Sequence, residues 1–262
     1  MPFVTVNDIR MHYVEAGSGE PLVVLHGLGS CAEDWEEQVA RFDGSYRVIV
    51  PDLRGFGLTD KADGPYSVAG FAADVSGLLA QLGVERFNLL GFSMGGAVAF
   101  QLALNAPDAV QSLIIVNSLP SFELDSPKKR FMVASRMMMA RLLGMERVVK
   151  ILSARVLPEP HQREAREELI ERHKTNSTAC YLAAIRALAG WSIRPRLGEL
   201  RMPVLVVASD QDYTDVAEKE ATVAALPDAR LAVIRDSRHV VYVDQPEAFT
   251  RAVLEFLASV SP

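Results

Sequence analysis

The sequence has 262 residues, of which 49 % are hydrophobic and 23 % charged, and its formal net charge is −6. Such a chain is typical of a globular protein with one large domain, or one domain with a substantial insertion, that buries a sizeable core. The negative charge argues against a nucleic-acid partner and against an anionic membrane surface.

The two cysteines, Cys31 and Cys180, form neither a metal-ligand pattern nor a disulfide framework, so we expect no metal and no other cofactor. Free thiols suit a reducing compartment, and a single disulfide between the two cysteines is the alternative. Residues 1–13 are polar and strand-like and lack the features of a signal peptide, and no apolar run reaches the about 20 residues of a transmembrane helix. We therefore expect a cytoplasmic protein without membrane insertion.

Strand-like and helical patterns alternate along the first 116 residues. Strands are expected at 21–26, 46–51, 86–90 and 110–116, and helices at 33–42, 68–82 and 94–105. Apolar strands separated by helices are typical of a parallel sheet with crossover helices.

The alternation stops between residues 118 and 195, where helical stretches are separated by prolines. It resumes with strands at 203–209 and 230–234 and helices at 215–225 and 247–260. We predict a helical insertion at 118–195 within a core made of 1–117 and 196–262. The alternative is a set of further crossover helices, but the stretch is long for one crossover.

The strongest local motif is Gly91–Gly96, with the sequence GFSMGG. It fits G-x-S-x-G between a predicted strand and a predicted helix, the context in which a serine hydroxyl is exposed on a sharp turn as a nucleophile. A glycine-rich turn that only packs tightly is the alternative. The motif lacks the Gly-Lys-Ser/Thr ending of a phosphate-binding loop. Ser93 is therefore the candidate nucleophile.

A serine nucleophile needs a base, and the chain has five histidines. We expect His12 to be structural, because it lies in a predicted N-terminal strand. His161 and His173 fall in the polar insertion and are expected in solvent. His26 ends a buried strand. His239 follows the last strand, at the sheet edge where active sites of parallel sheets form, and is the candidate base.

The base in turn needs an acid that fixes its tautomer. Asp212 follows the strand at 203–209, with Asp210 as its rival. The order Ser93, Asp212, His239 is the chain order of α/β-hydrolase triads.

Backbone N–H groups must hold the oxyanion of the tetrahedral intermediate. One is expected from Met94, the residue after the nucleophile, and the other from Leu28, in the loop after an earlier strand. His26 then organises this loop.

At this point the chain resembles the α/β-hydrolase superfamily, and within it the small bacterial esterases, enol-lactonases, perhydrolases and carbon–carbon bond hydrolases. The resemblance spans nearly the whole chain and is carried by HGLGS (26–30), DLRGFGLTD (52–60), GFSMGG (91–96), VVASDQD (206–212) and RHVVYVDQPEAF (238–249). The family often has glycine where Ser209 and Arg238 stand and proline where Asp215 stands.

The resemblance implies a mostly parallel eight-stranded sheet flanked by helices, with a helical cap inserted after the strand at about 110–116. It implies Asp212 rather than Asp210 as the acid, and His239 as the base. The expected activity is hydrolysis of small or medium apolar esters or lactones through an acyl-enzyme. Carbon–carbon cleavage of a diketone, perhydrolysis, and a small-molecule receptor with slow turnover remain open.

Four side chains are candidate substrate contacts: Phe92, Met132, Met138 and Trp191. Phe92 flanks the nucleophile, and the methionines offer an adaptable apolar surface. The alternative is that the methionines only pack the inserted helices together. A homodimer through the insertion or an edge strand also remains open.

Overall fold

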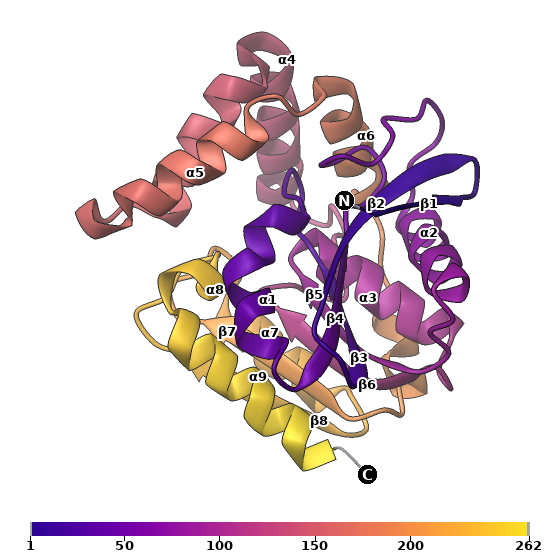
Figure 1. The fold of residues 1–262 in the computed structure, drawn as a ribbon. Helices are drawn as coiled ribbons and strands as arrows, with labels where there is room; N and C mark the ends of the chain where they lie inside the picture. The colour runs from indigo at the N-terminus through magenta and orange to yellow at the C-terminus, as the bar shows by residue number, and fades with distance from the viewer. Residues whose placement is uncertain (1, 261–262) are drawn as a thin grey trace.

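An eight-stranded sheet forms the centre of the computed structural model, which describes residues 2–260 (Figure 1). The strands are β1 (Phe3–Val6), β2 (Ile9–Ala16), β3 (Glu20–Leu25), β4 (Tyr46–Pro51), β5 (Phe87–Phe92), β6 (Val110–Val116), β7 (Val204–Ser209) and β8 (Ala229–Ile234). Their order is β1-β2-β4-β3-β5-β6-β7-β8. β1 and β2 are antiparallel to their neighbours, and β3 to β8 run parallel. The predicted fold class is confirmed.

Helices cover both faces of this sheet. The core helices are α1 (Glu36–Phe42), α2 (Val68–Gln81), α3 (Met94–Asn105), α7 (Val216–Ala224), α8 (Val241–Asp244) and α9 (Pro246–Val260), with the short 3-10 helices η1 (Ala32–Trp35) and η3 (Arg194–Glu199). One apolar cluster packs α2 and α3 on the sheet, and a second packs α1 and α9 on the opposite face. β5 is buried along its whole length, as expected for a central strand covered on both sides.

Two N-terminal expectations are corrected. The strand-like stretch 1–13 forms two strands joined by a turn at Asn7 and Asp8, which both have positive φ (residue 1 lies outside the described part). Asn and Asp tolerate this conformation better than most residues, which explains the turn. The helix expected at 33–42 begins with the 3-10 helix η1 before α1.

The segment between β6 and β7 contains α4 (Pro127–Val156), the 3-10 helix η2 (Pro160–Gln162), α5 (Arg163–His173) and α6 (Thr178–Leu188). We call α4, α5 and α6 the insertion helices; they lie together beyond one end of the sheet (Figure 1). Gly144, with φ of 72°, interrupts α4.

The two ends of this segment meet. Ser121 and Ser192 form an isolated antiparallel bridge, and the Phe122 N–H donates to the Trp191 carbonyl at 2.8 Å. The chain thus leaves the core and returns to it at one place. Across residues 2–260, no helix is both long and apolar enough to cross a membrane.

Candidate active site

Ser93 lies on the turn between β5 and α3, with φ of 53° and ψ of −115°. A positive φ is sterically costly for a residue with a Cβ and persists only where the surroundings impose it. Here the Ser93 N–H donates to Val116 O at 3.0 Å, and the Ser93 carbonyl accepts from the Ser118 hydroxyl at 2.7 Å and from the Gly96 N–H at 3.0 Å. The turn is therefore fixed on both sides of the serine.

Gly95 allows the first turn of α3 to approach the end of β3. A Cβ at this position would lie 2.2 Å from the Leu25 carbonyl oxygen and 2.7 Å from that of His26. Backbone oxygens cannot move aside as a flexible side chain can, so only glycine fits. The close approach brings the N-terminus of α3 next to the loop after β3.

Ser93, His239 and Asp212 form one chain of hydrogen bonds. The Ser93 Oγ lies 3.0 Å from His239 Nε2, and His239 Nδ1 lies 2.8 Å from Asp212 Oδ1. The rival acid Asp210 points elsewhere, because its Oδ1 accepts from the Ser237 N–H at 3.2 Å. The three residues that the sequence singled out thus come together at the carboxyl ends of β5, β7 and β8.

A buried lysine, Lys219 on α7, pairs with the second oxygen of Asp212. Its Nζ lies 2.9 Å from Asp212 Oδ2, and both side chains are fully buried. The Thr214 hydroxyl also donates to this oxygen. Burial acts to raise the pKa of Asp212, but His239, Lys219 and Thr214 outweigh it and hold that pKa below its usual range. Asp212 is therefore a carboxylate at neutral pH.

Asn117 connects the parts of the site. It has φ of 44° at the end of β6, and its amide Nδ2 donates to the His239 carbonyl at 2.8 Å and to Ser209 Oγ at 2.8 Å. Its Oδ1 accepts from the Ser209 N–H at 2.9 Å and from Lys219 Nζ at 3.1 Å. One buried amide thus ties the histidine loop, β7 and α7 together.

Tyr213 adds a second hydroxyl beside the histidine. Its hydroxyl lies 2.8 Å from His239 Nε2 and also interacts with Ser93. The residue is 59 % exposed, but burial of its hydroxyl end raises the pKa of Tyr213 to about 12, against an opposing effect of Arg136. The phenol is therefore neutral at pH 7 and can donate to the histidine.

The loop after β3 lies against the nucleophile. A Cβ on Gly27 would lie 3.4 Å from Ser93 Cβ. His26 Nδ1–H donates to the Gly27 carbonyl at 2.8 Å, and its Nε2 accepts from the Leu53 N–H at 2.9 Å. Burial lowers the pKa of His26, in keeping with this neutral, one-donor form. The loop that carries Leu28 is thus held beside Met94, the first residue of α3.

The remaining histidines differ from one another. His12 is buried and pairs with Asp52 at 2.7 Å, whereas His161 is exposed. The expectation that His173 is in solvent is wrong: its Nε2 lies 2.6 Å from the buried Asp34 of η1. The sequence pattern missed this because the partner lies on a distant element.

The four candidate substrate contacts lie in different surroundings. The Phe92 ring is buried, with its centroid 4.9 Å from that of His239, so it packs against the histidine. Trp191 Nε1 donates to Gln101 Oε1 on α3 at 3.2 Å. Met132 and Met138 are 53 % and 58 % exposed.

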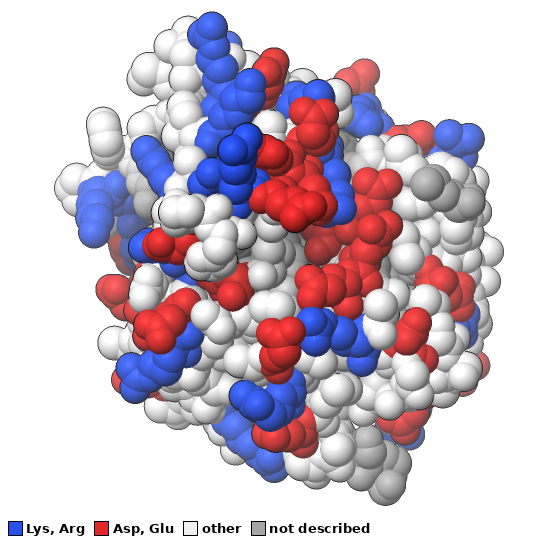
Figure 2. Space-filling view, turned by 60° about the vertical axis from the view of Figure 1, so that its left-hand side comes forward, with Lys and Arg blue, Asp and Glu red and all other residues white. Residues whose placement is uncertain are grey.

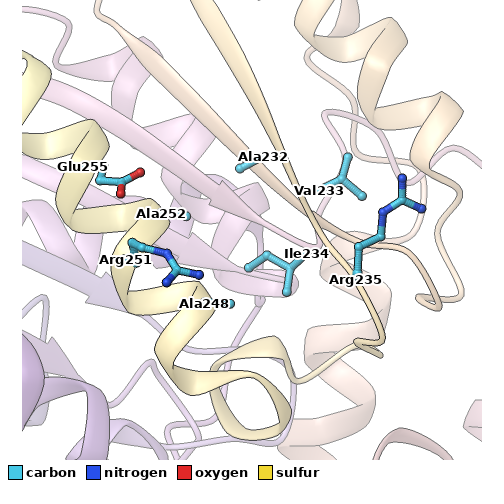
Figure 3. Close-up of a pocket in the computed structure, with 8 residues that line it drawn as sticks. All are labelled: Ala232, Val233, Ile234, Arg235, Ala248, Arg251, Ala252 and Glu255. Carbon is cyan, nitrogen blue, oxygen red and sulfur yellow. The ribbon is translucent and has the colours of Figure 1, made fainter.

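Two further features, a pocket and a cluster of side chains, lie apart from the triad. A pocket between β8 and α9 has Arg235, Arg251 and Glu255 as its charged lining, and it does not include the triad (Figure 3). Separately, Cys31, Asp34 and His173 bring possible metal ligands within 4.8 Å of one another. In this group His173 already bonds Asp34, and burial raises the pKa of the Cys31 thiol, which disfavours the thiolate that metals bind.

Comparison with known proteins identifies the family of this chain. Residues 20–246 match the family model described as alpha/beta hydrolase fold. The chain is 28 % identical to "3-oxoadipate enol-lactonase 2" of Acinetobacter baylyi, over 95 % of this chain and 94 % of that protein. It is 29 % identical to a 2-hydroxy-6-oxo-6-phenylhexa-2,4-dienoate hydrolase of Comamonas testosteroni, over 96 % of this chain and 92 % of that protein.

A solved structure is similar over the same range. The enol-lactonase of Burkholderia xenovorans LB400 superimposes with a TM-score of 0.89 at 26 % identity, covering 98 % of this chain and all of that one (100 %). The family model covers most of the chain, from residue 20 to residue 246. The chain therefore belongs to the α/β-hydrolase fold family.

Proposed function

We propose that this protein is a serine hydrolase that cleaves carboxylic esters or lactones of small to medium acyl compounds through an acyl-enzyme on Ser93. The observation that carries the proposal is the continuous hydrogen-bonded chain from Ser93 through His239 to Asp212. This arrangement of nucleophile, base and orienting acid is what acyl transfer by serine requires. A relative named as an enol-lactonase supports the lactone among the substrates.

In this proposal each of the three hydrogen-bonded residues has one role. Ser93 Oγ attacks the carbonyl carbon while His239 Nε2 accepts its proton, and Asp212 stabilises the charged imidazole through Nδ1–H. His239 then donates the proton to the leaving group. In the second half, His239 deprotonates water, which attacks the acyl-enzyme and releases Ser93.

The N–H groups of Met94 and Leu28 are proposed to bind the oxyanion. The first N–H groups of a helix have no partner within the helix, and Met94 begins α3. Gly27 lies against Ser93 and Leu28 is the next residue, which supports the Leu28 N–H as the second donor. The insertion helices are proposed to act as a cap over this site.

Carbon–carbon bond hydrolysis is the second candidate. It is favoured by the similarity to the Comamonas testosteroni dienoate hydrolase, whose name describes a substrate with a ketone and a carboxylate. The two candidates differ in the bond that is broken.

The test is hydrolysis of p-nitrophenyl esters, from acetyl to dodecanoyl, by the native chain and by Ser93→Ala. We expect turnover of short esters, and a loss of at least about a thousandfold in the variant, because the nucleophile is gone. Ser45→Ala, at an exposed serine, is the matched control and should leave turnover unchanged. Labelling by a fluorophosphonate, mapped by mass spectrometry, should occur at Ser93.

Native turnover that equals that of Ser93→Ala would contradict the proposal. Cleavage of a ring-opened diketone without ester turnover would support the second candidate. Tight ligand binding with neither reaction would indicate a receptor.

A further inference from the structure

Arg136, on α4, is a half-buried cation. Across residues 2–260, no Asp or Glu carboxylate forms an ion pair with it; its contacts are with two tyrosines. Arg54 shows the usual arrangement, since its guanidinium bonds both oxygens of Asp74 at 2.7 Å. A guanidinium is always protonated, and phenol hydroxyls offer it dipoles but no negative charge.

The first tyrosine holds Arg136 over the loop after β3. Arg136 Nε–H donates to the Tyr181 hydroxyl at 2.7 Å, and the Tyr181 ring lies against that loop, 3.1 Å from where a Cβ on Gly29 would be. Tyr181 is buried on α6. The guanidinium is thus positioned by an ordered partner.

The second tyrosine connects Arg136 to the catalytic residues. The Tyr213 hydroxyl interacts with Arg136 on one side and lies 2.8 Å from His239 Nε2 on the other. Two hydrogen bonds in series span at most about 6 Å. A group bound to Arg136 therefore lies close to a carbonyl held at Ser93.

We propose that Arg136, positioned by the hydroxyls of Tyr181 and Tyr213, binds a carboxylate group of the substrate. The inference rests on the proposed function and narrows its substrate class to anionic esters or lactones. About three methylene groups fit between the carboxylate and the scissile carbonyl, given the span of about 6 Å. The planar guanidinium with its N–H groups matches a carboxylate in shape and charge.

The charge of α4 favours the same ligand. In a chain of net charge −6, this helix carries one acidic residue, Glu146, and the basic residues Lys128, Lys129, Arg130, Arg136, Arg141, Arg147, Lys150 and Arg155. Figure 2 shows Lys and Arg side chains gathered in the upper part of the molecule, where the insertion helices lie, beside a group of acidic side chains. A locally positive surface attracts an anionic substrate.

The experiment compares two esters that differ in one group. Monomethyl glutarate carries a carboxylate where methyl pentanoate carries a methyl group, and methanol release reports both reactions. We expect the native chain to prefer monomethyl glutarate, and Arg136→Gln to lower the kcat/KM ratio of the two esters about 10- to 100-fold, the range for a charge-assisted hydrogen bond. Arg136→Lys should partly restore the preference for monomethyl glutarate, because it keeps the positive charge.

Arg141→Gln is the matched control. It removes the same charge from the same helix at an exposed side chain and should leave the ratio unchanged. If Arg136 only braces α4 against Tyr181, Arg136→Gln will reduce turnover of both esters equally and leave the ratio as it was, which overturns the inference.

A binding measurement separates this inference from the proposed function. Glutarate is titrated calorimetrically into Ser93→Ala with Arg136 intact or changed to Gln. Arg136-dependent binding without turnover of either ester supports the carboxylate site while the hydrolase proposal fails. Turnover that depends on Ser93, with no Arg136-dependent binding or selectivity, overturns the carboxylate site and leaves the hydrolase. If neither ester turnover nor Arg136-dependent binding is observed, the carboxylate site and the hydrolase proposal are both overturned.

Discussion

At the scale of single residues, Lys219 is the least expected part of the site. Its ammonium has three N–H donors and meets three acceptors: Asp212 Oδ2 at 2.9 Å, Asn117 Oδ1 at 3.1 Å and the Thr214 carbonyl at 3.1 Å. It touches no reacting atom. We therefore regard it as a positioning residue that keeps Asp212 ionised and oriented toward His239.

Lys219→Met tests this role. Without the cation the pKa of Asp212 rises toward its ordinary value, so kcat/KM should fall on the acidic side at a higher pH than in the native chain. The direction follows from the sign of the shift: a carboxylate with a lowered pKa stays charged until the pH falls through that pKa. A pH profile of ester hydrolysis from about pH 3 to 7 measures it, because the ordinary pKa of an aspartate is about 3.9.

Lys219→Met should also lower the free energy of unfolding by about 3–5 kcal/mol, because one partner of a buried ion pair is lost. Lys61→Met, at an exposed lysine, should alter neither property. A loss of stability without any change in the pH at which kcat/KM falls on the acidic side would show that Lys219 has only a structural role.

Tyr213→Phe tests the hydroxyl beside the histidine. Neutral Nε2 has one lone pair, and the Tyr213 hydroxyl lies 2.8 Å from it against 3.0 Å for Ser93 Oγ. Removing a competing hydrogen bond of about 1 kcal/mol should raise kcat for a neutral ester such as methyl pentanoate about two- to fivefold. An unchanged or reduced kcat would mean that the hydroxyl does not compete with Ser93.

Sequence patterns identified Ser93, Asp212 and His239 because each follows a strand in a readable context. They could not identify Lys219, which stands between two glutamates in the helical stretch VAEKEATVA and reads as solvent-exposed. Its burial depends on the way α7 packs against β7, which is a tertiary fact. The sequence patterns also gave no role to Asn117, although its side chain makes five hydrogen bonds.

At the scale of elements, the β5–α3 turn depends on close backbone packing. Gly95→Ala would place a Cβ 2.2 Å from the Leu25 carbonyl oxygen and force α3 away from β3. We expect a loss of about 1–3 kcal/mol in urea denaturation, together with reduced ester turnover as Met94 moves.

Gly44→Ala is the matched control for this substitution, because nothing lies within 4 Å of a Cβ at that position. It should be close to neutral. Equal effects of the two substitutions would argue that Gly95 is needed for its chain flexibility and not for space.

The boundaries of the central elements followed well from sequence, since β4, α3 and β6 end where apolar runs and glycine or polar residues predict. The strand order did not. Alternation predicts parallel neighbours, but it does not tell that β3 lies between β4 and β5. The interruption of α4 at Gly144 was also missed, because a single glycine is tolerated within many helices.

At the scale of the whole molecule, α5 is fastened to the core by Asp34. This buried carboxylate bonds His173 at 2.6 Å and lies 3.5 Å from the Arg172 guanidinium. Burial acts to raise the pKa of Asp34, but His173 and the Ser30 hydroxyl outweigh it and lower the pKa. The contribution of ionised Asp34 to the free energy of unfolding is therefore complete above the pKa of an aspartate in the unfolded chain, about 3.9. It is lost as the pH falls below that value.

Asp34→Asn should loosen this contact at neutral pH. We expect amide hydrogen exchange of α5 to accelerate about 10- to 100-fold relative to α2, since a charge-assisted bond is lost. The native chain should show the same acceleration only in acid. Asp63→Asn, at an exposed carboxylate, serves as the control, and exchange that rises equally in α2 and α5 would indicate global unfolding instead.

The bridge between Ser121 and Ser192 has a consequence for how such a molecule can diversify. The polypeptide leaves the core and returns to it through neighbouring backbone hydrogen bonds. The segment between the two serines is therefore an exchangeable unit, attached to the core at one place. A different set of helices could replace this segment at the same two residues without changing the positions of the serine turn and the histidine loop. Substrate preference, which depends in part on Arg136 in this exchangeable unit, can then change while the catalytic residues of the core stay the same.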